Sequence, residues 1–579
     1  MCKLLTPSIE KPWLKFFSEE AREASMPKNT IYRHLRECSE GGHSDTALNY
    51  FGKKISYGKL LDEADRAAGA FKAAGIKKGD IVAAATVTIP EMVYALYGLN
   101  KIGAAPLIID PRTSAAGAMS FIKETGAKVF IVIDLYYEAL RDVLFESGVE
   151  KIVVISADTS LPASIRFLKQ FKMPAPRIET SDKVLTWTQF ASTGEGVETE
   201  TAAYGDNDLA AVTLTGGTTG APKGVMLSND GFNAIAFDFK HCGVSYNRGQ
   251  RFLNIIPMFS SYGIVSSLHM PLSLGLEVVI IPKFDPEKVG RYVKKYRPEH
   301  TLLVPAHYEK LMNSREMAKG FDLSFFRTAG SGGDTMNAGL EAKLNSFLES
   351  RGCRYPLSQG YGMSEVSSAA SCCCNGNFKS LSVGYPLLTT TIAIFAPDSF
   401  NELDYGEEGE ICISGPSIML GYLNNKAETD NVIRRHPDGT LWVHSGDIGH
   451  MDPDGFVYIK GRIKRMITLF NGHKIFPTHI ESVLGHHPMV ASCAVVGVND
   501  TTHAQGQLTL AVIEAKEHAL EKLTAIKNEL YEMCRQELEG PAKPYDIIFV
   551  ESMPHTGMGK IDYIKLAEDY NNENKTEAV

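Results

Sequence analysis

A segment rich in glycine, hydroxyl groups and lysine follows one of the strand-like runs. Residues 209–214 lead into Thr215-Gly216-Gly217-Thr218-Thr219-Gly220-Ala221-Pro222-Lys223-Gly224. Glycines let backbone N–H groups approach a polyphosphate, hydroxyls donate hydrogen bonds, and the lysine adds positive charge. The spacing differs from GxxxxGK[ST], which disfavours an ordinary P-loop nucleotide triphosphatase. Composition alone leaves a phosphate-binding loop and a flexible surface loop equally supported.

Five motifs in a fixed order carry a resemblance to a known family. TGGTTGAPKG resembles the phosphate loop of the adenylate-forming superfamily, which contains acyl-CoA synthetases, peptide-synthetase adenylation domains and luciferases. The later motifs are Gln359-Gly360-Tyr361-Gly362-Met363-Ser364-Glu365, Ser445-Gly446-Asp447, Gly461-Arg462-Ile463-Lys464 and Pro554-His555-Thr556-Gly557-Met558-Gly559-Lys560. They resemble the family's YGxTE, TGD, GRxK and PxTxxGK segments and, together, make a chance match very unlikely.

The resemblance implies a two-step ligase reaction that uses ATP, Mg²⁺ and coenzyme A. A carboxylate attacks the α-phosphate to form an acyl-adenylate, and negative charge at that centre requires cations and preorganised donors. Lys560, Thr218 and Lys223 are the implied catalytic residues, with Thr218, Thr219 and Lys223 closing over the β- and γ-phosphates. Glu365 is the implied Mg²⁺ ligand. Without their motifs, Lys560 would be a solvated charge and Glu365 a surface acid.

The resemblance also implies a nucleotide pocket. Tyr361 would stack on adenine, Asp447 would accept hydrogen bonds from both ribose hydroxyls, and Arg462 would reach ribose or phosphate. A packed aromatic and a structural ion pair are the alternatives for these residues. The full implied nucleotide-binding set is Thr215, Gly216, Gly217, Thr219, Gly220, Gly332, Gly333, Asp334, Tyr361, Gly362, Ser364, Asp447 and Arg462.

In the family, the second step follows rotation of a small C-terminal domain about a hinge just after GRxK. The hinge position here is Arg465, which divides the chain into an AMP-binding N-terminal domain (1–464) and a mobile C-terminal domain (465–579). The incoming loop is Asn471-Gly472-His473-Lys474, where Gly472 would let pantetheine pass close to the backbone in a thiol tunnel. A simple turn residue is the alternative for Gly472.

The acyl pocket is expected after Ser260, at 329–331 and around Gly360, where small or apolar residues suit an alkyl chain. Ser260 stands where many family members have His, which leaves the gate of this pocket open to question. Ser364 in place of Thr keeps the hydroxyl, and Arg465 replaces the more usual Asp or Lys of the hinge.

These motifs require a scaffold, and short β-branched runs alternating with helical patterns predict parallel sheets covered by helices. One series of predicted strands is 81–87, 106–110, 129–133 and 152–156, and the other is 209–215, 254–257, 278–282 and 301–305. We therefore predict an α/β fold whose large N-terminal domain contains two doubly wound halves. Runs 406–411 and 455–460 predict an additional antiparallel β layer.

The smaller α+β C-terminal domain is predicted to contain strands at 494–498 and 508–513. A helix should follow, since apolar residues recur at i+3 and i+4 steps. These core positions are Leu520, Leu523, Ile526, Leu530 and Met533.

Length and composition limit the classes of protein to consider. The 579 residues exceed what one core usually organises, and 44% hydrophobic with 22% charged residues is typical of globular proteins. A formal net charge of −9 disfavours a nucleic-acid partner. The start of the chain lacks an apolar signal segment, and the charge-free run 252–276 is broken by prolines, so we expect a cytoplasmic protein without integral membrane association.

The ten cysteines form no CxxC pair and are expected to be reduced thiols, with Cys372-Cys373-Cys374 as packing residues. The leading functional hypothesis is a ligase that joins a medium- or long-chain fatty acid to coenzyme A. Activation of an aryl acid, or loading of a carrier-protein thiol, is the alternative within the enzyme class. A non-catalytic nucleotide-binding regulator is the alternative of another class.

Overall fold

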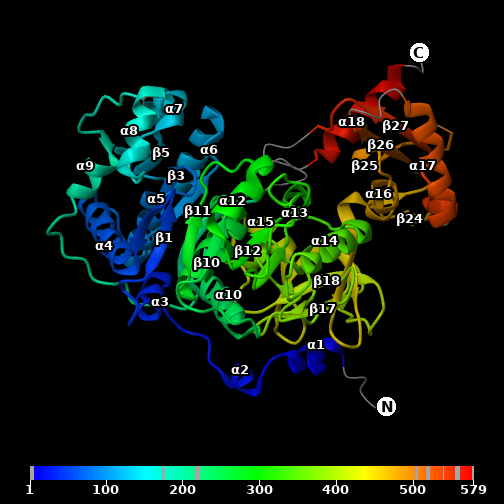
Figure 1. Ribbon diagram of the computed structural model, residues 1–579, viewed down its shortest axis with the longest axis horizontal. Coiled ribbons are helices and arrows are strands. Elements are labelled where there is room, and N and C mark those ends of the chain that lie inside the picture. Colours follow the sequence, from blue (N-terminus) through cyan, green and yellow to red (C-terminus); the bar gives the residue numbers. More distant parts are fainter. Residues whose placement is uncertain are drawn as a thin grey trace.

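The structure is a computed structural model of the 579-residue chain. It describes residues 6–172, 176–215, 222–500, 502–503, 506–516, 522–538, 540–554 and 561–576. Figure 1 shows a large body containing two α/β units and a β layer, with a smaller C-terminal unit, coloured orange to red, at one side. This arrangement confirms the predicted fold class.

The first α/β unit contains an eight-stranded sheet of order β19-β9-β8-β4-β3-β5-β6-β7. Its strands from β3 to β8 run parallel, and β9 turns back antiparallel to β8 across the glycine-rich segment. The bounds are β3 (Ile81–Ala85), β4 (Ala105–Ile109), β5 (Val129–Ile133), β6 (Lys151–Ile155), β7 (Val184–Thr186), β8 (Leu209–Leu214), β9 (Gly224–Ser228) and β19 (Gly421–Tyr422).

The helices of this unit are amphipathic or fully buried. Every residue of α5 is buried, and α4 packs along it. Their bounds are α4 (Tyr57–Ala73), α5 (Pro90–Lys101), α6 (Ala115–Thr125), α7 (Asp134–Glu146), α8 (Ala163–Lys172) and α9 (Trp187–Ser192). Parallel strands alternating with helices are the pattern predicted from the sequence.

The second α/β unit contains a nine-stranded sheet of order β16-β15-β14-β13-β12-β10-β11-β1-β2. The six strands from β14 to β1 are parallel neighbours, and both edges turn antiparallel. The bounds are β1 (Thr46–Tyr50), β2 (Lys53–Ser56), β10 (Arg251–Asn254), β11 (Glu277–Ile280), β12 (His300–Leu303), β13 (Thr328–Ser331), β14 (Ser358–Tyr361), β15 (Ser371–Cys372) and β16 (Tyr385–Pro386).

Three strands of this sheet end earlier than predicted. β10 ends at Asn254, and the predicted residues up to Pro257 form a loop, because proline cannot donate to a strand ladder. Pro305 begins helix α13 instead of ending a strand, which suits a residue whose missing N–H costs nothing at the first helical position. The helices here are α10 (Asn229–His241), α12 (Val289–Tyr296), α13 (Pro305–Met312) and α14 (Ala338–Ser350).

The antiparallel β layer was predicted correctly. It pairs β17 (Thr391–Phe395), β18 (Gly409–Ser414), β21 (Leu441–Met451) and β20 (Ile433–Arg435), with β22 (Val457–Arg462) on the other edge of β21. The register of β21 shifts against both β18 and β22, and these irregularities lie beside the SGD motif.

The C-terminal unit has the predicted α+β composition. Its three-stranded sheet contains β25 (Val490–Asn499), β26 (Gln507–Ala515) and β27 (Asp546–Val550), with helices α16 (Pro477–Gly485), α17 (Leu523–Glu537) and α18 (Tyr563–Thr576). Ile526 and Leu530 of α17 are buried, as the helical pattern predicted, while Leu520 lies outside the described residues. Among the described helices, none combines the length and apolar character needed to cross a membrane.

Hydrogen bonds to a buried carboxylate connect the second α/β unit to the segment that precedes the β layer. Asp238 of α10 is fully buried and accepts hydrogen bonds from the backbone N–H and the hydroxyl of Thr389, both 2.9 Å long. Burial raises the pKa of Asp238 to about 7, although the two bonds from Thr389 oppose the shift. The native state therefore favours the protonated acid.

This raised pKa predicts a pH-dependent stability. The native chain binds more protons than the unfolded chain between about pH 4 and 7, so the free energy of unfolding falls as pH rises through that window. Asp238→Asn keeps an acceptor for Thr389 and removes the titration. We expect the stability of the variant relative to the native chain to rise by roughly 2 to 3 kcal/mol between pH 5 and pH 8. Urea unfolding across this range measures the difference, and a difference that is constant with pH would contradict the assignment.

Candidate active site

An open cleft of about 1850 Å³ lies where parallel strands of the second sheet end. β14 carries the start of the QGYGMSE motif, and β13 leads into the predicted residues Gly332, Gly333 and Asp334; ligands of open α/β sheets bind at such strand ends. The predicted residues that line the cleft are Thr215, Lys223, Ser260, Gly332, Gly333, Asp334, Gly360, Tyr361, Gly362, Ser364, Glu365 and Arg462. Gly216, Gly217, Thr218, Thr219, Gly220 and Lys560 lie outside the described residues.

Three of the motifs meet at one buried carboxylate. Asp447, only 4% exposed, accepts a 2.6 Å hydrogen bond from the Tyr361 hydroxyl and a 2.9 Å bond from Nε of Arg462. Asp447 and Arg462 are direct partners across β21 and β22. Burial raises the pKa of Asp447, and the charge of Arg462 opposes that rise. The ion pair considered from the sequence is thus present at the edge of the cleft.

A second group surrounds Glu365. Its carboxylate is buried and accepts a 2.6 Å hydrogen bond from the Tyr422 hydroxyl, and burial together with Glu365 raises the pKa of that tyrosine. Lys223 forms an ion pair with Glu428, and its Nζ lies 4.9 Å from the centre of the Tyr422 ring. The sequence analysis missed Tyr422 and Glu428, because they belong to no motif and meet the cleft only through β19 and α15 (Lys426–Val432).

The glycines of the cleft allow backbone segments to approach one another. A Cβ at Gly362 would lie 1.9 Å from the carbonyl oxygen of Ser368, so this turn cannot accept a side chain without moving. Gly333 has φ +80°, a left-handed conformation that favours glycine. Close backbone approach thus accounts for glycine at 362, and the left-handed conformation accounts for glycine at 333.

Comparison with known proteins identifies the family. Residues 35–423 match the model of the AMP-binding enzyme family, and residues 479–560 match the model of the AMP-binding enzyme C-terminal domain. The chain belongs to the AMP-binding enzyme family. The resemblance found in the sequence is therefore confirmed, and the chain is an acid–thiol ligase of this family that uses ATP, Mg²⁺ and coenzyme A.

Relatives of this AMP-binding enzyme include ligases for different acids. A long-chain-fatty-acid–CoA ligase of Bacillus subtilis (strain 168) is 28% identical over 573 residues, covering 97% of this chain and 98% of the relative. A probable 4-coumarate–CoA ligase 1 of Dictyostelium discoideum is 28% identical over 536 residues, covering 92% and 93%. The ATP-bound structure of MatB from Rhodopseudomonas palustris matches with a TM-score of 0.78 and 23% identity, covering 94% of this chain and 99% of that one. The last comparison supports the fold alone.

The described residues of the AMP-binding enzyme fit these small molecules. Glu365 offers a hard carboxylate oxygen of the type that Mg²⁺ prefers. The hydroxyl of Ser331 lines the cleft and is buried, yet it has no hydrogen-bond partner among the described residues. Such an atom is costly unless a ligand satisfies it. Lys223 and Arg462 add positive charge at the same cleft.

Ser260, a predicted acyl-pocket residue, lines the cleft. Its hydroxyl donates to the carbonyl of Pro257 (2.9 Å) and accepts from the N–H of Gly263 (3.1 Å), so it fixes the entry into the π-helix Tyr262–His269. Ser260 is therefore held in local structure at the position where many family members have His. Gly360, the other predicted pocket residue, lies against Cys372, whose thiol is buried and unbridged.

The predicted hinge residue is held by the C-terminal unit. Arg465 forms an ion pair with Glu481 of α16, and its guanidinium lies 3.5 Å from the centre of the Tyr563 ring. Gly472 has φ +81° and lies in the exposed turn between β23 (Ile467–Thr468) and β24 (Lys474–Ile475), where its N–H donates to Leu469. It is not among the residues that line the cleft here. Its role as a thiol-tunnel residue stays a prediction.

Gly362→Ala should damage adenylation because the new Cβ collides with a backbone carbonyl that has little freedom to move. We expect acid-dependent ATP/pyrophosphate exchange to fall at least roughly tenfold, together with a lower Tm. Gly439→Ala is the control for the added atom alone, since a Cβ at Gly439 has nothing within 4 Å, although Gly439, unlike Gly362, has a positive φ. That control should lose only about 1 kcal/mol of stability. Equal effects of the two substitutions would contradict the close-approach argument.

Proposed function

We propose that this AMP-binding enzyme is a fatty acyl-CoA ligase that acts on medium- or long-chain acids. The observation that carries this proposal is an apolar wall in the same cleft as the nucleotide motifs. It is formed by Phe239, Ile256, Phe259 and Leu302. An alkyl chain gains about 0.8 kcal/mol for each CH₂ that it buries against such a wall. The 28% identity to a long-chain-fatty-acid–CoA ligase over nearly the whole chain supports the same choice.

In the proposed reaction, the carboxylate of the acid attacks the α-phosphorus of ATP, and pyrophosphate leaves. The coenzyme A thiol then attacks the acyl carbonyl, and AMP leaves as the thioester forms. Lys560 would stabilise charge in the first step, while Thr218 and Lys223 hold the outgoing phosphates. Mg²⁺, held by Glu365, would neutralise phosphate charge when bound.

The described geometry supports the remaining proposed nucleotide contacts. Asp447 lies at the edge of the cleft with both oxygens within reach of polar partners, which suits a pair of ribose hydroxyls. Arg462 stands beside it and can contact ribose or phosphate. Tyr361, with Gly332, Gly333 and Asp334, would enclose adenine, since all four line the cleft.

An aryl acid is the second candidate substrate. Ser261, Ser266 and Ser368 place hydroxyls in the wall of the cleft, and such groups could bind a ring substituent. Relatives named as 4-coumarate–CoA ligases are 28% identical or less. A carrier-protein thiol in place of coenzyme A is a further alternative for the acceptor.

A panel of acids tests the proposal. With ATP, Mg²⁺ and coenzyme A, we expect kcat/KM to rise by up to roughly tenfold for each two carbons added, until the apolar wall is filled. Product masses should identify acyl-CoA and AMP. Benzoate and 4-coumarate are the aryl comparison, and a holo carrier protein is the comparison acceptor. Faster turnover of the aryl acids than of any fatty acid would overturn the assignment.

The two half-reactions should respond differently to two substitutions, because they are proposed to use different placements of the 465–579 domain. Lys560→Ala should abolish ATP/pyrophosphate exchange while retaining most thioester formation from synthetic acyl-adenylate. Gly472→Trp should show the reverse pattern, since a bulky side chain would obstruct pantetheine. The two variants serve as controls for each other, and equal losses in both half-reactions for either variant would refute the domain alternation.

A further inference from the structure

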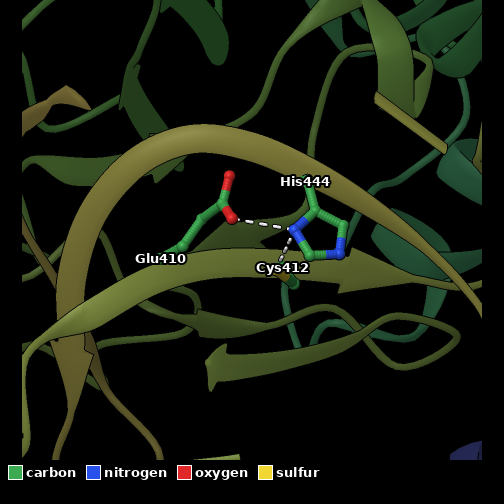
Figure 2. Close-up of side chains that lie close together, drawn as sticks. All are labelled: Glu410, Cys412 and His444. Atoms are coloured by element: carbon green, nitrogen blue, oxygen red, sulfur yellow. Dashed lines mark hydrogen bonds and ion pairs between the residues drawn. The ribbon is translucent and has the colours of Figure 1, made fainter. Parts of the chain in front are cut away.

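A chain of buried polar side chains lies directly behind the SGD motif. Figure 2 shows Glu410, Cys412 and His444 gathered in the β layer, with the carboxylate and the thiol next to the same nitrogen of the imidazole. His444 Nδ1 lies 2.8 Å from Oε2 of Glu410 and 3.4 Å from Sγ of Cys412. On the other side of the ring, His444 Nε2 lies 3.1 Å from Nε2 of His436. All four side chains are buried.

The carboxylate of Glu410 is hydrogen-bonded to the backbone of the SGD motif. Its second oxygen, Oε1, accepts the backbone N–H of Gly446 at 3.0 Å. Gly446 has φ +71° and stands where the register between β18 and β21 shifts. Such a bulge removes a residue from regular strand pairing, so its N–H needs another acceptor. Glu410 supplies that acceptor.

Two further bonds complete the bulge and lead to Asp447. The Ser445 hydroxyl donates to the carbonyl of Ile411 at 2.6 Å and accepts the N–H of Asp447 at 3.0 Å. The backbone that presents the Asp447 carboxylate is thus fixed on both sides of Gly446. No contact between Glu410 and Asp447 side chains is needed for this effect.

The network is hydrogen-bonded throughout. With the proton of His444 on Nδ1, this ring donates to Glu410 and accepts from His436 at Nε2. Burial raises the pKa of Glu410, but the hydrogen bonds from His444 and from the N–H of Gly446 lower it to below its ordinary value overall. This cluster also contains atoms of the kinds that bind transition metals, in Glu410, Cys412 and His444. However, both ring nitrogens of His444 and both carboxylate oxygens of Glu410 already have hydrogen-bond partners.

We infer that Glu410, oriented by His444, is a positioning residue that fixes the Gly446 bulge so that Asp447 faces the ribose of the nucleotide. The inference rests on the proposed function, because the ribose contact of Asp447 is part of it. Glu410 lines the cleft, but both of its carboxylate oxygens are already bonded to protein groups, so its proposed effect passes through the backbone. Its effect should therefore appear in how strictly the enzyme requires ribose hydroxyls.

The test compares ATP with 2′-deoxy-ATP in acid-dependent pyrophosphate exchange. The ratio of their kcat/KM values reports the ribose contact, whereas a general loss of folded enzyme lowers both values equally. Glu410→Leu removes the acceptor for Gly446 N–H at similar volume, and we expect the ratio to fall about tenfold. Glu410→Gln keeps an oxygen that accepts the N–H of Gly446, and His444 can change tautomer to accept from the new amide. This variant should remain within about twofold of the native ratio.

Three further variants make the outcome decisive. Glu408→Leu is the matched control, because Glu408 lies on the same segment with a side chain 50% exposed and pairs only with Lys460 among the described residues. It should leave the ratio unchanged. His444→Leu should lower the ratio as Glu410→Leu does, and it replaces that variant if Glu410→Leu does not fold. Asp447→Asn should lower the ratio most.

Each contrary result would overturn a different part of the proposal. An unchanged ratio in Asp447→Asn would refute the ribose role within the proposed function. A lowered ratio in Asp447→Asn, with native ratios in folded Glu410→Leu and His444→Leu, would overturn the positioning role alone. Equal losses in Glu410→Gln and Glu410→Leu would also overturn it, since the acceptor would then be irrelevant. Elemental analysis that finds one transition metal per native chain, lost from Glu410→Leu, would overturn it in favour of a metal site.

Discussion

The buried carboxylate of Asp447 sets a constraint on which the arrangement of the cleft depends. An ionised carboxylate removed from water costs several kcal/mol unless charged and hydrogen-bonding partners surround it. Its partners come from different parts of the chain: Tyr361 ends a strand of the second sheet, and Arg462 ends the last strand of the β layer. The carboxylate can be satisfied only when these elements come together. The stabilising contacts therefore also assemble the proposed nucleotide site.

Glu365 is likewise satisfied by a partner from a different part of the chain. Its partner Tyr422 lies on β19, which pairs with β9 at the edge of the first sheet, while Glu365 follows β14 of the second. Lys223 packs over that tyrosine and pairs with Glu428. Polar contacts thus link the two α/β units across the cleft. Lys223, which follows the glycine-rich segment in the chain, is thereby held at the cleft.

The sequence was informative where the signal is local or shared by a family. Alternating runs predicted the parallel strands, and twelve of the predicted site residues line the cleft. Strand ends were less predictable, since Ile255 and Ile256 have strand-like side chains but the chain turns before Pro257. Glu410, His444 and His436 had no local signal, because their association arises from pairing between β18, β21 and β20. Tyr422 and Glu428 were missed for the same non-local reason.

The contacts around residues 462–465 bear on how two placements of one domain could share a site. Arg462 bonds to Asp447 of the large body, whereas Arg465, three residues later, pairs with Glu481 and contacts Tyr563 of the C-terminal unit. The short helix Ile463–Arg465 therefore joins two firmly held ends. Bonds that cross between the units here include Gly339 N–H to His486 at 3.0 Å and the Thr478 hydroxyl to the carbonyl of Lys460. In the proposed rotation about the short helix, contacts of this kind would be exchanged, while each arginine keeps its partners within its own unit. Local contacts open more readily than a buried core, so this position suits a step repeated in every turnover better than a hinge within either core would.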